Sequence, residues 1–117
     1  MKSGFKLAVF LFFTVMTSMA YAHPASELLL SMDSKTKMLS VGIKHQVGDP
    51  ARHYIDQVNT TINGKMSIGH SLTKQDAASG ETLSYYLPDV KEGDVIAVDT
   101  HCNKGGNLKK EIVAQLQ

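Results

Sequence analysis

The sequence predicts an all-β domain, an immunoglobulin-like β-sandwich of about seven strands. Beyond position 22, apolar residues repeat at every second position, which is the period of a strand that packs one face on a core. No segment there sustains a helical period, and turn residues interrupt the region about every 8 to 12 residues, a spacing typical of sandwiches. We therefore expect one domain over residues 23–117.

The first 22 residues have the composition of a secretory signal peptide. Lys2 and Lys6 form a positive start, residues 7–16 (LAVFLFFTVM) form an apolar run, and AYA at 20–22 is a small-x-small cleavage site. The run is too short for a membrane span. We expect cleavage after Ala22, export to the periplasm, and a mature chain without a membrane anchor that begins with His23.

The first two strands are expected over residues 26–33 and 37–47. In the second strand one face carries small and polar residues, and the other carries an apolar row that includes a histidine. His45 therefore extends a row that points toward the core. The row consists of Leu39, Val41, Ile43, His45 and Val47.

A turn of Gly48, Asp49 and Pro50 precedes the third strand, which is expected over residues 53–62. Ile55 and Val58 are apolar but three positions apart, so they would lie on opposite faces of a regular strand. This indicates a β-bulge between them. The next turn, Asn63 and Gly64, is a good hairpin turn and leads into a strand over 65–72.

Three further strands are expected over residues 81–88, 95–102 and 108–116. In the strand over 95–102, one side carries Ile96, Val98, Thr100 and Cys102. Because this row is the more apolar one, it should face the core, and Cys102 should end it. His101 should then point away from the core.

Charge and cysteine content narrow the function classes. The 12 basic and 11 acidic side chains nearly cancel, so no basic field for nucleic acid exists. The single cysteine, Cys102, cannot form an internal disulfide in an exported chain. It is either a buried, inert thiol or a metal ligand or reactive thiol.

His45 and Cys102 end equivalent inward rows on two strands, so they can meet at one end of the sandwich. His53 would enter from the turn, and His23 precedes the first strand. Thiolate with imidazole suits iron, copper or zinc, and a terminal His23 would add a free amine that favours copper. The alternative is that the histidines are only polar residues at strand tips. Nothing in the sequence brings His70 into this group.

Two segments resemble the iron-binding domain of superoxide reductases, the desulfoferrodoxin and neelaredoxin group. They are HQVGDPARHYI at 45–55 and YYLPDVKEGDVIAVDTHCNKGG at 85–106. The resemblance implies a sandwich that holds one non-haem iron through planar histidines and an axial cysteine. Matched residue by residue, it implies a metal site of His23, His45 and His53, with Cys102 as the axial thiolate.

Two departures from the family's pattern bear on activity. Gly105 stands where the family has its last histidine, and the family's lysine ahead of its first histidine falls inside the expected signal peptide. The first loss leaves an additional open metal position. The second removes a positive charge that helps to attract superoxide.

These observations lead to two functional hypotheses. The first is an exported mononuclear non-haem iron protein, similar to superoxide reductase, that reduces superoxide or exchanges single electrons with a redox partner protein. The second is a non-catalytic periplasmic carrier of copper or of a sulfur compound. A swinging-arm sulfur carrier is disfavoured, because the chain lacks the C-terminal Gly-Gly-Cys arm of the thiosulfate-oxidation carriers.

Overall fold

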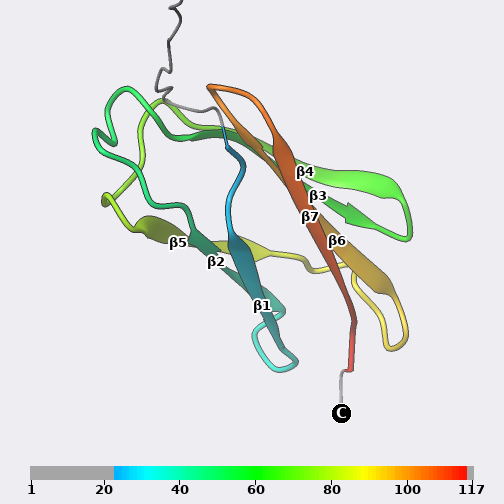
Figure 1. The fold of residues 1–117 in the computed structure, drawn as a ribbon. Coiled ribbons are helices and arrows are strands. Elements are labelled where there is room, and N and C mark those ends of the chain that lie inside the picture. Colours follow the sequence, from blue (N-terminus) through cyan, green and yellow to red (C-terminus); the bar gives the residue numbers. More distant parts are fainter. Residues whose placement is uncertain (1–22, 116–117) are drawn as a thin grey trace, which may run out of the picture.

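The structure, a computed structural model, describes residues 23–115 and contains seven strands and no helix in that range (Figure 1). The predicted all-β class is therefore confirmed. The strands are β1 (Glu27–Asp33), β2 (Met38–Lys44), β3 (Ile55–Ile62), β4 (Lys65–Ser71), β5 (Gly80–Tyr86), β6 (Val95–Cys102) and β7 (Asn107–Val113).

The strands form two antiparallel sheets that pack as a sandwich. One sheet has the order β1-β2-β5, and the other has the order β4-β3-β6-β7 (Figure 1). Side chains bridge the sheets at both edges. The Lys110 ammonium on β7 donates to the Leu28 carbonyl on β1 at 3.0 Å, and the Tyr85 hydroxyl on β5 lies 2.7 Å from His70 Nδ1 on β4.

The core follows the alternating rows that the sequence predicts. All five residues of the row that includes His45 are buried, and so are Ile96, Val98, Thr100 and Cys102 on β6. His101, between two buried positions of β6, is partly exposed and points to the other face. The predicted orientation of both rows is confirmed.

The bulge predicted in the third strand is also present. Ile55 lies opposite Cys102 and Gln57 lies opposite His101. The step between these two pairs spans two residues of β3 but only one of β6, which is a β-bulge. The Asn63–Gly64 turn joins β3 to β4, with φ of 52° and 82° at the two positions. Positive φ at both central residues is the geometry of a tight hairpin turn.

Several strands are shorter than the sequence predicts, and in β2 and β3 the difference places both histidines in connecting segments. β2 ends at Lys44, because the His45 and Val47 amides donate to the carbonyls of Ser79 and Ala78 and leave the regular ladder. β3 begins at Ile55, two residues after His53. The segment from 45 to 54 thus lies outside the β2 and β3 ladders and connects the two sheets.

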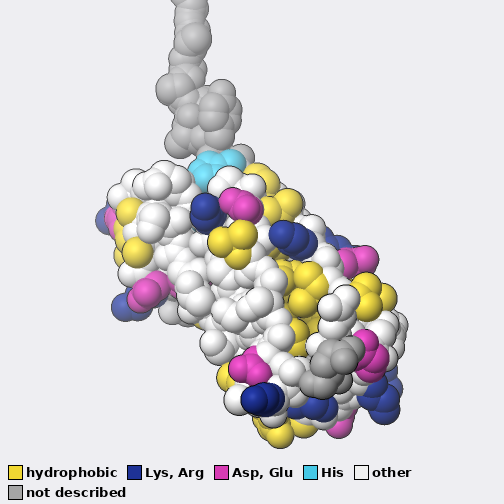
Figure 2. All heavy atoms as spheres, turned by 90° about the horizontal axis from the view of Figure 1, so that it is seen from below, with side chains coloured by type: hydrophobic (Ala, Val, Ile, Leu, Met, Phe, Trp, Pro, Cys, Tyr) yellow, Lys and Arg dark blue, Asp and Glu magenta, His cyan; other side chains and the backbone are white. Residues whose placement is uncertain are grey.

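The predicted signal peptide, residues 1–22 with its cleavage site after Ala22, lies outside the described residues, so cleavage and export stay predictions. Among residues 23–115, no helix is long and apolar enough to cross a membrane. Figure 2 shows charged side chains of both signs scattered over one face, with histidine reaching the surface at one end.

Candidate metal centre

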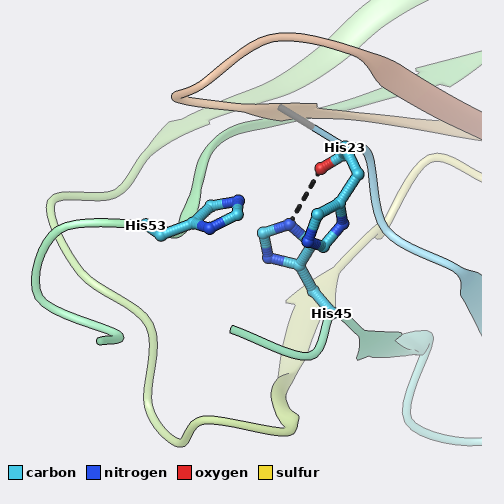
Figure 3. A group of neighbouring side chains, drawn as sticks. All are labelled: His23, His45 and His53. Atoms are coloured by element: carbon cyan, nitrogen blue, oxygen red, sulfur yellow. Dashed lines mark hydrogen bonds between the residues drawn. The ribbon is translucent and has the colours of Figure 1, made fainter. Parts of the chain in front are cut away.

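Three histidines from three separate segments meet at one end of the sandwich. His23 precedes β1, His45 follows β2, and His53 precedes β3 (Figure 3). Their ring centroids lie 4.8 Å apart for His23 and His45, 4.8 Å for His23 and His53, and 4.9 Å for His45 and His53. One ring nitrogen from each lies within 4.8 Å of the others, so the three form a nearly equilateral group.

The hydrogen bonds of the rings indicate which nitrogen each would offer to an ion. His23 Nδ1 lies 3.1 Å from the Pro24 carbonyl, which can only accept, so Nδ1 carries the proton and Nε2 keeps a lone pair. The Nε2 atom of His53 is buried and has no partner. Buried polar atoms almost always have one, so this atom is a candidate for a ligand that the protein itself does not supply.

Asn103 fixes the position of His53. Its side-chain oxygen accepts from the Tyr54 amide at 2.9 Å, and its side-chain nitrogen donates to the Arg52 carbonyl at 3.0 Å. The Asn103 amide also donates to the Tyr54 carbonyl at 2.9 Å. Because these bonds hold the residues on both sides of His53, they anchor it to the end of β6.

A close backbone contact fixes the position of His23. Gly106 packs against Pro24, and a β-carbon at position 106 would lie 2.9 Å from Pro24 Cδ. Gly106 has φ of 95°, a conformation that residues with a side chain rarely adopt. The glycine lets the chain that carries His23 lie directly on the loop after β6.

The surroundings of His53 favour its neutral ring. The pKa of His53 is lowered from its ordinary value of 6.5, first by burial and then by the charges of His45, His23 and Lys104. A neutral imidazole is the form that binds a metal. His53 is therefore ready to bind an ion at neutral pH without first losing a proton.

Cys102 does not belong to the group of the three histidines. It is fully buried among core residues, and its Sγ atom accepts from the Lys104 amide at 3.4 Å. It nevertheless lies next to Asn103, which anchors His53, and opposite Ile55. The thiol is thus at the same end of the sandwich as His53, and its role as a ligand stays a prediction.

The remaining histidines are held elsewhere by other partners. His101 Nδ1 lies 2.7 Å from Asp56 Oδ1 on the face of the sheet opposite the core. Burial raises the pKa of the Tyr85 hydroxyl, which keeps its proton and lies 2.7 Å from His70 Nδ1. Gly105 has no side chain that could act as a ligand.

The donor set fits a transition-metal ion. Three imidazoles that leave further coordination positions open are a known arrangement for zinc, copper and iron. Nitrogens bound to one ion at about 2.0–2.1 Å would lie closer together than 4.8 Å, so binding would draw the rings inward. His23 and His53 are only partly buried, which leaves an ion a route from solvent.

No family model, curated protein or solved structure matches this chain. The functional argument therefore rests on the geometry of the three histidines and on the residues that hold them.

Sequence reasoning missed the residues that hold the histidines in place. Gln75, Asn103 and Gly106 make their contacts with segments far away in the chain. A polar residue in a loop and a glycine in a Gly-Gly pair carry no signal of such contacts. The one available hint was the position of Asn103 directly after the only cysteine.

Proposed function

We propose that this chain binds a single iron ion through His23, His45 and His53 and acts as an exported mononuclear non-haem iron protein similar to superoxide reductase. The observation that carries this proposal is the meeting of three imidazoles from separate segments, with His53 Nε2 buried and without a partner. Iron would supply one-electron redox chemistry when bound.

The surroundings of Cys102 support the redox form of this proposal. A thiolate from Cys102 would be the fourth protein donor, as the resemblance to superoxide reductases implies. The amide of Lys104 donates to Sγ at 3.4 Å, so the sulfur already accepts a hydrogen bond from the loop after β6.

Lys104 supports a reaction with an anion. Its side chain is exposed, and its charge acts on the ring of His53. A positive group at the mouth of a site raises the local concentration of a small anion such as superoxide. Lys104 would thus take over the attraction that the family assigns to a lysine ahead of its first histidine.

The test is metal binding and turnover by the purified mature protein. Loaded anaerobically with ferrous iron, it should bind one ion per chain and, once oxidised, show a thiolate-to-iron absorption band that Cys102→Ser abolishes. It should consume superoxide when a reductant supplies electrons. His45→Ala and His53→Ala should each lose the iron.

His70→Ala and His101→Ala are the matched controls, because these histidines lie outside the group and have their own partners. Both should retain the iron. Equal losses in all four variants, or a protein that binds no iron, would refute the proposal.

The second candidate function is a non-catalytic copper carrier. The observation that favours it is that the group consists of three nitrogen donors without the sulfur of Cys102. If the mature chain begins at His23, its free amine would add a fourth nitrogen, a set that cupric copper prefers. Tight copper binding that is unchanged in Cys102→Ser, without consumption of superoxide, would favour this function over the first.

A further inference from the structure

Gln75 lies in the connection between β4 and β5, and its buried amide packs against His45. The side-chain oxygen, Oε1, lies 2.7 Å from His45 Nδ1. The side-chain nitrogen, Nε2, donates to the carbonyls of His45 at 2.8 Å and Ala77 at 2.9 Å. Only 3% of Gln75 is exposed, so water does not compete with these bonds.

The contacts of Gln75 determine which way its amide points. Two carbonyl oxygens lie at hydrogen-bond distance from one end of the amide, and carbonyl oxygens only accept. That end must therefore be the NH₂ group, because an oxygen there would face two other oxygens. The end that faces His45 must be the carbonyl oxygen.

This orientation determines the tautomer of His45. Because Gln75 Oε1 can only accept, His45 Nδ1 must donate and must carry the proton. In the neutral ring, Nε2 then keeps its lone pair. Nε2 is the nitrogen that lies 3.1 Å from the His23 carbonyl oxygen, beside the other two rings (Figure 3).

A lone pair that faces a carbonyl oxygen repels it. The arrangement is therefore satisfied only when positive charge, either a proton or a metal ion, lies at Nε2. Gln75 thus leaves His45 with one nitrogen that is already satisfied and one that requires a cation.

We propose that Gln75 is a positioning residue that holds His45 in its Nδ1–H tautomer and directs the Nε2 lone pair toward a bound metal. The part of this inference that concerns metal affinity rests on the proposed function. The tautomer does not, because the hydrogen bonds of the chain itself determine it.

A merely structural role for Gln75 is the competing explanation, because its backbone amide also donates to the Pro50 carbonyl at 2.9 Å. Two substitutions separate the roles. Gln75→Glu keeps an acceptor for Nδ1–H but loses the donors to the two carbonyls, so it should destabilise the fold and retain the tautomer. Gln75→Leu removes the acceptor as well as the donors, so it should lose both the stability of the fold and the Nδ1–H tautomer.

The tautomer is measured in the metal-free protein by ¹⁵N–¹H correlation spectra of the histidine rings at about pH 8.5, two units above the ordinary pKa of histidine. His45 should be an Nδ1–H ring in the wild type and in Gln75→Glu, and should lose this preference in Gln75→Leu. Gln46→Leu, on the exposed neighbour of His45, is the matched control and should match the wild type. A neutral ring protonated at Nε2 and not at Nδ1 in the wild type would overturn the inference, even if Gln75→Leu fails to fold.

Metal affinity is measured by competition for Zn²⁺ against a chelator of known affinity. Loss of the hydrogen-bond partner of a metal-binding histidine lowers metal affinity about 10- to 100-fold. Gln75→Leu should therefore bind Zn²⁺ about 10- to 100-fold more weakly than the wild type. Gln75→Glu and Gln46→Leu should bind Zn²⁺ within a few-fold of the wild type. Equal affinity in Gln75→Leu and the wild type would overturn the role of Gln75 but leave the metal site intact. Absence of Zn²⁺ binding in the wild type would overturn the proposed site together with this role, whereas the tautomer would still stand on the spectra.

Discussion

Pro24 lies so close to Gly106 that a β-carbon at position 106 would approach its Cδ atom to 2.9 Å and its backbone nitrogen to 3.1 Å. This contact joins the segment before β1 to the loop after β6. It places the backbone next to His23 on the loop that follows Cys102. The position of one of the three histidines therefore depends on a residue without a side chain.

Gly106→Ala should displace Pro24 and with it His23. The change also places a side chain at φ of 95°, which destabilises the fold by about 1–3 kcal/mol. We expect metal affinity to fall at least about tenfold, measured by Zn²⁺ competition. Gly48→Ala is the control, because no atom lies within 4 Å of a β-carbon built there. Unchanged affinity in Gly106→Ala would show that His23 does not depend on this contact.

Asn103→Ala should release His53. The substitution removes two hydrogen bonds to the residues beside it, each contributing about 0.5–1.5 kcal/mol, and leaves the Tyr54 amide without its side-chain acceptor. Urea unfolding should show a loss of about 1–3 kcal/mol. Metal affinity should fall by about 10- to 100-fold.

Asn107→Ala is the matched control for that experiment, since the Asn107 side chain makes only an exposed bond to Asp99 at 3.1 Å. It should change stability by less than about 0.5 kcal/mol and leave metal affinity unaltered. If both asparagine variants bind the metal as the wild type does, Asn103 does not position His53.

Gly80→Ala should be the most damaging glycine substitution in the domain. A β-carbon at position 80 would lie 1.9 Å from the Ile43 carbonyl oxygen, and φ there is 138°. We expect a loss of at least about 3 kcal/mol from backbone strain and overpacking together, measured by urea unfolding. The segment before Gly80 pairs with the backbone of His45 and should move with it.

Gly69→Ala is the control for Gly80→Ala, because a β-carbon there would meet only the side chains of Asn59 at 3.5 Å and Gln57 at 3.8 Å. It should cost less than about 1 kcal/mol. Similar losses in the two variants would argue against the close approach of Gly80 to β2.

The metal-free protein should become less stable as the pH falls below about 6.5. The pKa of His53 is lowered in the folded chain, first by burial, so the unfolded chain binds this proton more readily. The stability that the neutral ring contributes is complete above the ordinary pKa of 6.5 and is lost as the pH falls toward the folded value.

Urea unfolding at a series of pH values from about 8 to 5, with a chelator present, measures this effect. His53→Gln cannot take up the proton and should show a flatter dependence on pH over that range. A wild-type protein and a His53→Gln variant with the same pH dependence would contradict the lowered pKa.

Local patterns in the sequence predicted much of the fold. The alternation around His45 and the row that ends at Cys102 predicted which faces are buried, because a strand places every second side chain on the same face. The parity change between Ile55 and Val58 predicted the bulge. These features depend on neighbours a few residues apart, so the sequence alone carries them.

The ends of the strands were predicted less well. His45 and His53 were expected within strands, but the backbone leaves the ladder at both. The reason is that His45 pairs with Ser79 in the connection between β4 and β5, a contact that no local pattern announces. The candidate site lies where this departure occurs.

The sequence by itself determined the class of the fold, the inward direction of His45 and Cys102, and the candidate donors. Only the tertiary structure decided that His23, His45 and His53 meet while Cys102 lies in the core outside their group, and that Gln75, Asn103 and Gly106 hold the three rings in place. The physical reason is range. Burial periodicity is a property of one strand, whereas the meeting of side chains depends on how segments far apart in the chain pack against one another.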